Sequence, residues 1–184
     1  MRSGPVARLS ILMVIACVGI VHGAETLTAV ATVKTAGGAT ATTPVSVTID
    51  RTTPAAEAET LVAAFKTSGA AGLRAALKGI PPTGSIRIAG GAPTPTRLTI
   101  ERKTDKGRLL TIVTDAPLFF VGAAKPGAKP RAGYDFAVLD IEIGSDGSGA
   151  GTLAPAARIT VKESAFVVDD YGAEVVRLAL KPSR

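Results

Sequence analysis

Two carboxylates, Asp140 and Glu142, lie two positions apart in the alternating segment 134–144. Because alternate residues of a strand point to the same side, both side chains are expected on one face, about 7 Å apart. Paired carboxylates near that separation can perform general acid–base chemistry on a sugar. The same residues can form a polar stripe that pairs with Lys or Arg on a neighbouring strand, which is ordinary sheet construction. We expect the polar stripe and keep a carboxylate-based glycan hydrolase as the alternative.

Two further acidic segments are candidates for cation sites. Residues 144–151 have the sequence GSDGSGAG and offer a single acid, Asp146, whereas an EF-hand loop needs several acids and a terminal Glu. Asp169 and Asp170 stand in a segment whose composition is typical of a turn. We therefore expect two turns, with no bound metal and no cofactor.

A basic segment at residues 125–131 has the sequence KPGAKPR and carries Lys125, Lys129 and Arg131. Its two Pro residues remove backbone donors and fix φ, so the segment must connect strands and cannot be an interior strand. The three cations are candidate binding residues for an anionic partner. We expect that partner to be an anionic envelope component or another envelope protein. Nucleic acid is not expected, because basic and aromatic residues do not interleave.

The N-terminal residues have the layout of a secretory signal peptide. Arg2 and Arg8 precede an apolar run at residues 9–21, after which small residues resume. The run is shorter than the ~20 residues that a membrane-spanning helix needs. We expect residues 1–23 to be removed, which leaves one secreted or periplasmic domain at residues 24–184 without a transmembrane span.

The only cysteine allows a second processing route. Cys17 ends the sequence VIAC, which resembles the lipobox of bacterial lipoproteins, in which the Cys carries a lipid anchor. The apolar run continues past Cys17, whereas mature lipoproteins usually turn polar at that point. We therefore expect cleavage after Gly23 and keep a lipid anchor at Cys17 as the minority alternative.

Cleavage after Gly23 would remove the only Cys and the only His, His22. A Ser-His-Asp triad, a thiol nucleophile and a His- or Cys-ligated metal are then excluded. Losing Arg2 and Arg8 leaves 21 − 2 = 19 basic against 15 acidic side chains, a net charge of 19 − 15 = +4. We expect a non-catalytic domain that binds an envelope component or a partner protein. A structural module that adds a strand to a partner through an exposed edge is a further alternative.

Apolar periodicity predicts a single α+β domain. Apolar residues at helical spacing predict a helical pair, at about 54–67 and 70–79, with Thr53 as its N-cap. Short connections predict a mostly antiparallel sheet of about seven to nine strands, with the helical pair packed on one face. We expect the last two strands to form a hairpin. Period-2 alternation predicts strands at residues 26–34, 45–50, 84–90, 96–103, 108–115, 134–144, 150–162, 164–170 and 174–180.

Six segments between about residues 45 and 180 carry a family resemblance. The most specific pieces are the T-D-x-P turn that begins at Thr114 and the Y-x-F strand start at Tyr134. Together the segments resemble an uncharacterised family of small secreted bacterial proteins of acidobacterial type. The resemblance implies secretion and one α+β domain, and it implies no catalytic residue because the family has no assigned activity. The segments are VTIDRTTPAAEAETLVAAF at 47–65, LRAAL at 73–77, GSI at 84–86, IVTDAPLFF at 112–120, YDFAVLDIEI at 134–143 and GSGAG at 147–151.

Overall fold

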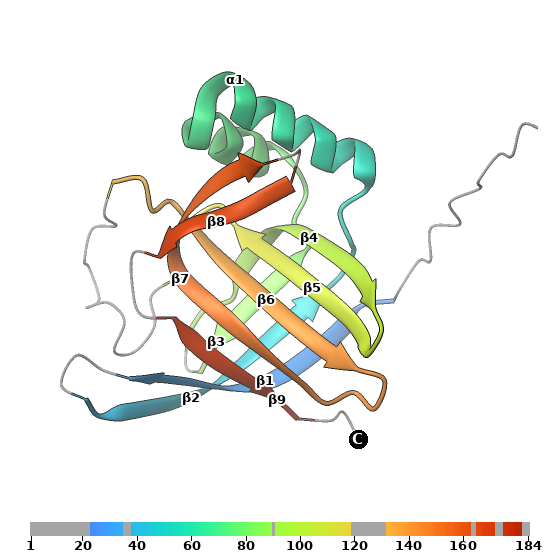
Figure 1. Cartoon of the computed structure of the whole chain (residues 1–184), viewed down its shortest axis with the longest axis vertical. Helices are drawn as coiled ribbons and strands as arrows, with labels where there is room; N and C mark the ends of the chain where they lie inside the picture. Colours follow the sequence, from blue (N-terminus) through green and yellow to red (C-terminus); the bar gives the residue numbers. More distant parts are fainter. Residues whose placement is uncertain are drawn as a thin grey trace, which may run out of the picture.

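The structure is a computed structural model, and it describes residues 23–34, 38–89, 91–118, 132–162, 165–171 and 175–181. Within these residues the chain forms nine strands and one helix (Figure 1). In chain order they are β1 (Glu25–Lys34), β2 (Thr40–Ile49), α1 (Ala55–Gly79), β3 (Gly84–Ile88), β4 (Thr94–Thr104), β5 (Gly107–Thr114), β6 (Phe136–Gly144), β7 (Gly149–Lys162), β8 (Ala165–Tyr171) and β9 (Val176–Leu180).

Eight of the strands close into an antiparallel barrel. Each strand from β1 to β7 pairs with the next along the chain, and β9 pairs with both β7 and β1, which closes the ring. The closing registers place Leu153 opposite Val176 and Ala29 opposite Leu180. Among the described strands, β8 pairs only with β7 and stays outside the ring. An up-and-down ring of this kind satisfies the backbone of its own strands without leaving a sheet edge.

Apolar side chains fill the inside of the barrel. Leu110, Leu139, Ile141 and Leu153 are each 0% exposed. They belong to one wholly apolar cluster that draws residues from every strand of the ring except β4. An eight-stranded barrel has an interior just wide enough for side chains to fill. The interior is therefore a packed core.

A second apolar cluster lies between the outer face of the barrel and α1, the helix that Figure 1 shows outside the barrel. Leu61, Leu73 and Leu77 of the helix pack there with residues from the outward faces of β4 to β8. Leu98 and Val113 are the floor of this cluster, and each is 2% exposed. The helix is therefore fixed to the outer surface by apolar burial, at about 25 cal/mol per Å² of apolar area removed from water.

The helical pair predicted at 54–67 and 70–79 is replaced by a single, sharply kinked helix. Ser68 (φ −134°, ψ 16°) and Gly69 (φ 59°, ψ −152°) leave the helical conformation, and the helix resumes at once without a loop. Gly adopts the positive φ at the kink without the strain that a Cβ would bring. The apolar spacing predicted the two halves, but it could not show that only two residues separate them.

The predicted α+β class is wrong, because the described chain is mostly β and its sheet is closed. The predicted period-2 alternation is present, but the alternate apolar residues line the inside of a ring. The predicted hairpin of the last two strands is also wrong, because β8 and β9 both pair with β7 instead of with each other. The antiparallel arrangement is confirmed. No helix in the described part of the chain is long and apolar enough to cross a membrane.

Candidate functional site

A groove runs over the outside of the barrel between the first half of α1 and β8. It consists of two cavities of about 530 and 290 Å³. Both are lined by Arg102, Thr111 and Phe166, so they form one continuous depression, which we call the outer groove. The helix wall is made by Ala55, Ala58, Glu59, Val62, Ala63 and Lys66, the floor by Leu98, Ile100, Arg102, Thr111, Val113, Val138 and Asp140, and the facing wall by Ile159, Phe166, Val167 and Val168.

The pairing register of β4, β5 and β6 arranges the floor in rows of increasing polarity. Side chains two apart on a strand share a face, and directly paired residues of neighbouring strands lie side by side. The first row is buried, the second is partly exposed, and the third begins with the exposed Arg102. From the buried cluster outward, the rows are Leu98–Val113–Val138, then Ile100–Thr111–Asp140, then Arg102–Leu109–Glu142.

The two carboxylates singled out from the sequence are divided by this arrangement. Asp140 lines the smaller cavity, and its Oδ1 accepts a hydrogen bond of 2.6 Å from the hydroxyl of Thr111. Glu142 is exposed and lines neither cavity of the groove. The pair does not face one cleft, which the glycan hydrolase alternative requires. The polar stripe was predicted with a Lys or Arg partner, whereas the recorded partner of Asp140 is a threonine.

Lys66 and Arg102 are the two cations of the outer groove, and both are exposed. Neither forms an ion pair with another described residue. Arg108 differs, because it bridges Glu25 at 2.5 Å and Glu101 at 3.1 Å. The hydrogen bond with Glu25 is the main cause that raises the pKa of Arg108, against the opposing effect of its partial burial. The groove cations therefore hold charge that no described acidic residue neutralises.

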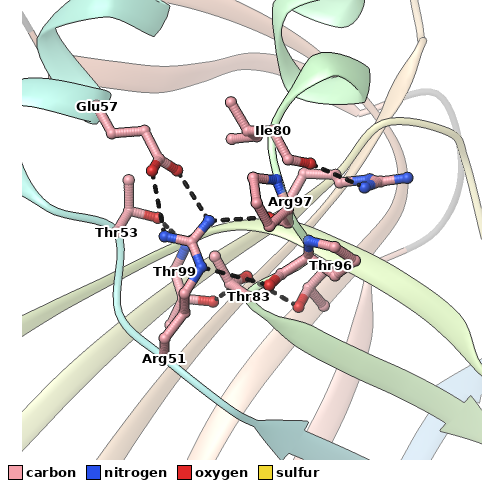
Figure 2. Close-up of polar contacts among 10 residues, drawn as sticks. Arg51, Thr53, Glu57, Ile80, Thr83, Thr96, Arg97 and Thr99 are labelled. Carbon is pink, nitrogen blue, oxygen red and sulfur yellow. Dashed lines mark hydrogen bonds and ion pairs between the residues drawn. The ribbon is translucent and has the colours of Figure 1, made fainter. Parts of the chain in front are cut away.

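A polar clasp around Arg51 fixes both ends of α1 to the barrel (Figure 2). Arg51 donates to the two carboxylate oxygens of Glu57, in the first turn, at 3.2 and 3.0 Å. It also donates at 2.8 Å to the carbonyl of Pro81, just after the helix ends. Arg97 adds a 3.0 Å bond to the carbonyl of Ile80. The clasp fixes the position of the helix wall of the groove, because the Arg51 side chain binds both the first turn of α1 and the segment that follows its last turn.

A cluster of threonines lies under the clasp (Figure 2). The buried hydroxyl of Thr83 bonds to those of Thr96 at 3.0 Å and Thr99 at 2.8 Å. The predicted N-cap role of Thr53 is wrong, because its hydroxyl accepts from the backbone N–H of Thr99 at 3.0 Å. The N-cap residue is Pro54, and no side chain caps the helix there.

The other residues singled out from the sequence fall outside the groove or outside the described residues. Lys125, Lys129, Arg131 and Cys17 lie outside the described residues, whereas Gly23 is the first described residue. No three acidic, His or Cys side chains of the described residues group closely enough to hold a metal ion.

The two acidic segments are structural in the described chain. Asp146 accepts hydrogen bonds from the hydroxyl of Ser148 at 2.7 Å and from its backbone N–H at 3.0 Å. The hydrogen bond from the Ser148 hydroxyl is the main cause that lowers the pKa of Asp146, and the bond from the backbone N–H adds to it. Both bonds shape the turn between β6 and β7 that the sequence predicted. The turn predicted at Asp169 and Asp170 is wrong, because both residues lie within β8 (Ala165–Tyr171), where Asp169 pairs with Arg158 of β7 at 2.9 Å.

Comparison with known proteins gives no match to a family model, to a curated protein or to a solved structure. Function therefore has to be argued from the geometry of the described residues.

Proposed function

We propose that this protein is a non-catalytic binding domain, secreted or periplasmic, that holds an amphiphilic envelope component in the outer groove. The observation that carries the proposal is a continuous, mainly apolar groove with cavities of about 530 and 290 Å³. Small-molecule sites are typically concave, roughly 300–1,000 Å³ in volume and mostly apolar, with a few placed polar groups. The signal-peptide pattern of residues 1–23 supports the location.

The outer groove is a better site than the barrel interior. Leu139, Ile141 and Leu153 fill the interior and are fully buried, so a ligand there would have to displace core side chains. Removing such packing costs several kcal/mol, about 2–5 for a single Leu. A ligand in the outer groove displaces water from a surface that is already concave, which leaves the barrel unchanged.

The graded floor supports an amphiphile as the ligand. The partly exposed Ile100, Phe166 and Val168 suit an apolar chain, and each CH₂ group buried against them contributes about 0.8 kcal/mol. Arg102 at the outer row suits a polar end. One molecule with an apolar chain and a polar head would match both ends of the groove at once.

A binding role is supported over catalysis by the state of Asp140. Glycoside hydrolysis needs two carboxyl groups that flank the scissile bond. Among the described residues, Asp140 is the only carboxylate on the groove floor, and it is already bonded to Thr111. The remaining groove acid, Glu59, lies on the helix wall as an exposed surface residue.

Binding is tested by titrating a fluorescent alkyl carboxylate against the purified protein and two tryptophan variants. Ala63 is exposed on the groove wall, so Ala63→Trp should occupy the site and weaken binding at least ~10-fold, about 1.4 kcal/mol. Ala75→Trp is the matched control, because Ala75 is exposed on α1 and lines neither groove cavity. Equal affinity in all three proteins, or no saturable binding by the parent protein, would refute the proposed site.

The location is tested by cell fractionation followed by mass spectrometry of the exported protein. We expect a mature chain that starts at Ala24 and appears outside the cytoplasm. A lipid-modified N-terminus at Cys17 would establish the anchored alternative. An unprocessed chain that still begins at Met1 and stays in the cytoplasm would contradict the proposed location.

A further inference from the structure

Arg102 stands where the two cavities of the outer groove meet. It lines both of them and shares this position with Thr111 and Phe166. Two residues earlier on the same face of β4, Ile100 lines the larger cavity. The aliphatic stem of an Arg can cover apolar surface while its guanidinium remains in water. Arg102 is thus placed at the boundary between the apolar floor and solvent.

The described acidic residues of the groove do not pair with its two cations. Asp140 is bonded to the hydroxyl of Thr111. Glu59 precedes Lys66 by seven residues on α1, which separates them by about 10 Å at 1.5 Å per residue. Neither acid lies within ion-pair distance of Lys66 or Arg102. An incoming anion would therefore not have to compete with an existing salt bridge.

We infer that the ligand of the outer groove is an anionic amphiphile whose carboxylate or phosphate head pairs with Arg102. This inference rests on the proposed function and specifies the ligand class for the same site. A guanidinium presents paired N–H donors that match a carboxylate or phosphate edge. The alkyl chain extends from that head along Ile100 and Leu98, between Val62 of the helix and Phe166 of β8.

The head group is tested by displacing the fluorescent probe with three ligands of equal chain length: an alkyl carboxylate, an alkyl phosphate and a neutral monoacylglycerol. We expect at least one of the anions to bind about 5- to 20-fold more tightly than the neutral ligand, as a charge-assisted hydrogen bond provides. A preference for carboxylate indicates free fatty acids as the source, and a preference for phosphate indicates phospholipid-derived ligands. Either preference supports an anionic head.

Arg102→Gln should remove this discrimination. We expect about a 10-fold loss for the favoured anion and a change below about twofold for the neutral ligand, since only the anion uses the guanidinium. Arg87→Gln is the matched control, because Arg87 is an exposed arginine on β3 that lines neither groove cavity and its loss changes the net charge equally. Arg102→Lys keeps the charge without the paired donors and should retain part of the preference.

The outcomes separate this inference from the proposed function. Tight binding of the neutral ligand at the level of the anions, or equal losses in Arg102→Gln and Arg87→Gln, would overturn the anionic head and leave the binding groove intact. Absence of saturable probe binding, or probe binding that Ala63→Trp does not weaken, would overturn both. Thermal unfolding of each variant shows whether the protein is folded when affinity is measured.

Discussion

The inside of the barrel and the outer groove are built on opposite faces of the same strands, yet they differ in what is left free. On β5 and β6, Ile112 and Leu139 point inward and are buried in an apolar cluster. Thr111 and Asp140 of the same strands point outward into the groove. Because the ring is closed, the inward side chains are packed in the core and are not available to a ligand. Recognition therefore has to be placed on the outer face, where polar side chains reach water.

Two excursions from an otherwise regular meander make the walls of the groove. α1 is inserted between β2 and β3, and β8 is inserted between β7 and β9. Figure 1 shows both on the outside of the barrel and next to each other. Val62 from the first and Phe166 from the second line the same cavity. The barrel thus serves as a rigid base, and the two insertions determine what it can bind.

The largest effect should come from a truncation inside the barrel. Leu139 is 0% exposed, and Leu139→Ala should lower the free energy of unfolding by about 2–5 kcal/mol, since it leaves a cavity in a closed core. Denaturant titration measures the change. The affinity of the folded fraction for the probe should stay within about twofold, because the groove lies on the other face of the strand. A loss below about 1 kcal/mol would show that the interior is loosely packed.

A smaller effect is expected at the base of the clasp. Thr83→Val keeps the side-chain shape but leaves the buried hydroxyls of Thr96 and Thr99 without their shared partner. We expect a loss of about 1–3 kcal/mol in the free energy of unfolding, the cost of unpaired buried polar groups. Thr67→Val is a control, because the Thr67 hydroxyl is exposed on α1 and bonds only within the helix. Equal stability losses in both variants would contradict a special role for the threonine cluster.

Local patterns in the sequence predicted most strands and the turn around Asp146 correctly. The segment 108–115 alternates, and β5 runs from Gly107 to Thr114. Gly107 has a φ of 152° and lies against the carbonyl of Ile143, where a Cβ would not fit, so a glycine is required at this hairpin. Such features depend on neighbours in the chain or on a directly paired strand, and for that reason they can be seen in the sequence.

The closure and the groove could not be predicted, because both depend on contacts between distant segments. Ala29 pairs with Leu180, and the inward alternation of both strands would be the same in an open sheet. A partial signal for the groove existed: Leu98 and Ile100 are apolar on the outward face of β4, which indicates that something covers that face. The sequence could not show that the cover is α1 together with Phe166.

The aromatic wall of the groove should affect affinity more than stability. Phe166 is only partly buried and lines both cavities. Phe166→Ala should weaken probe binding about 5- to 10-fold, or roughly 1–1.4 kcal/mol, through lost apolar contact with the ligand. The free energy of unfolding should fall by less than it does in Leu139→Ala, since Phe166 keeps a solvent-facing side. The reverse ranking in denaturant titrations would mean that β8 belongs to the core.

The smallest effect is expected for the second groove cation. Lys66 is exposed and lines only the larger cavity, whereas Arg102 lines both. Exposed charge pairs contribute about 0.2–1 kcal/mol, so Lys66→Gln should weaken binding of the alkyl carboxylate roughly twofold. Raising the ionic strength should reduce that difference, because salt screens exposed charges. Lys78→Gln, in the last turn of α1, makes the same charge change without touching either groove cavity.

Comparing the affinity losses of Arg102→Gln and Lys66→Gln will show where the ligand head lies. If the head sits at Arg102, the loss in Arg102→Gln must exceed the loss in Lys66→Gln, and Lys78→Gln must leave affinity unchanged. A larger loss at Lys66 would move the anionic head to the helix wall and reverse the direction of the chain in the groove. Equal small losses in all three variants would mean that the cations act only through net charge, and the outer groove would then select its ligand by its apolar floor alone.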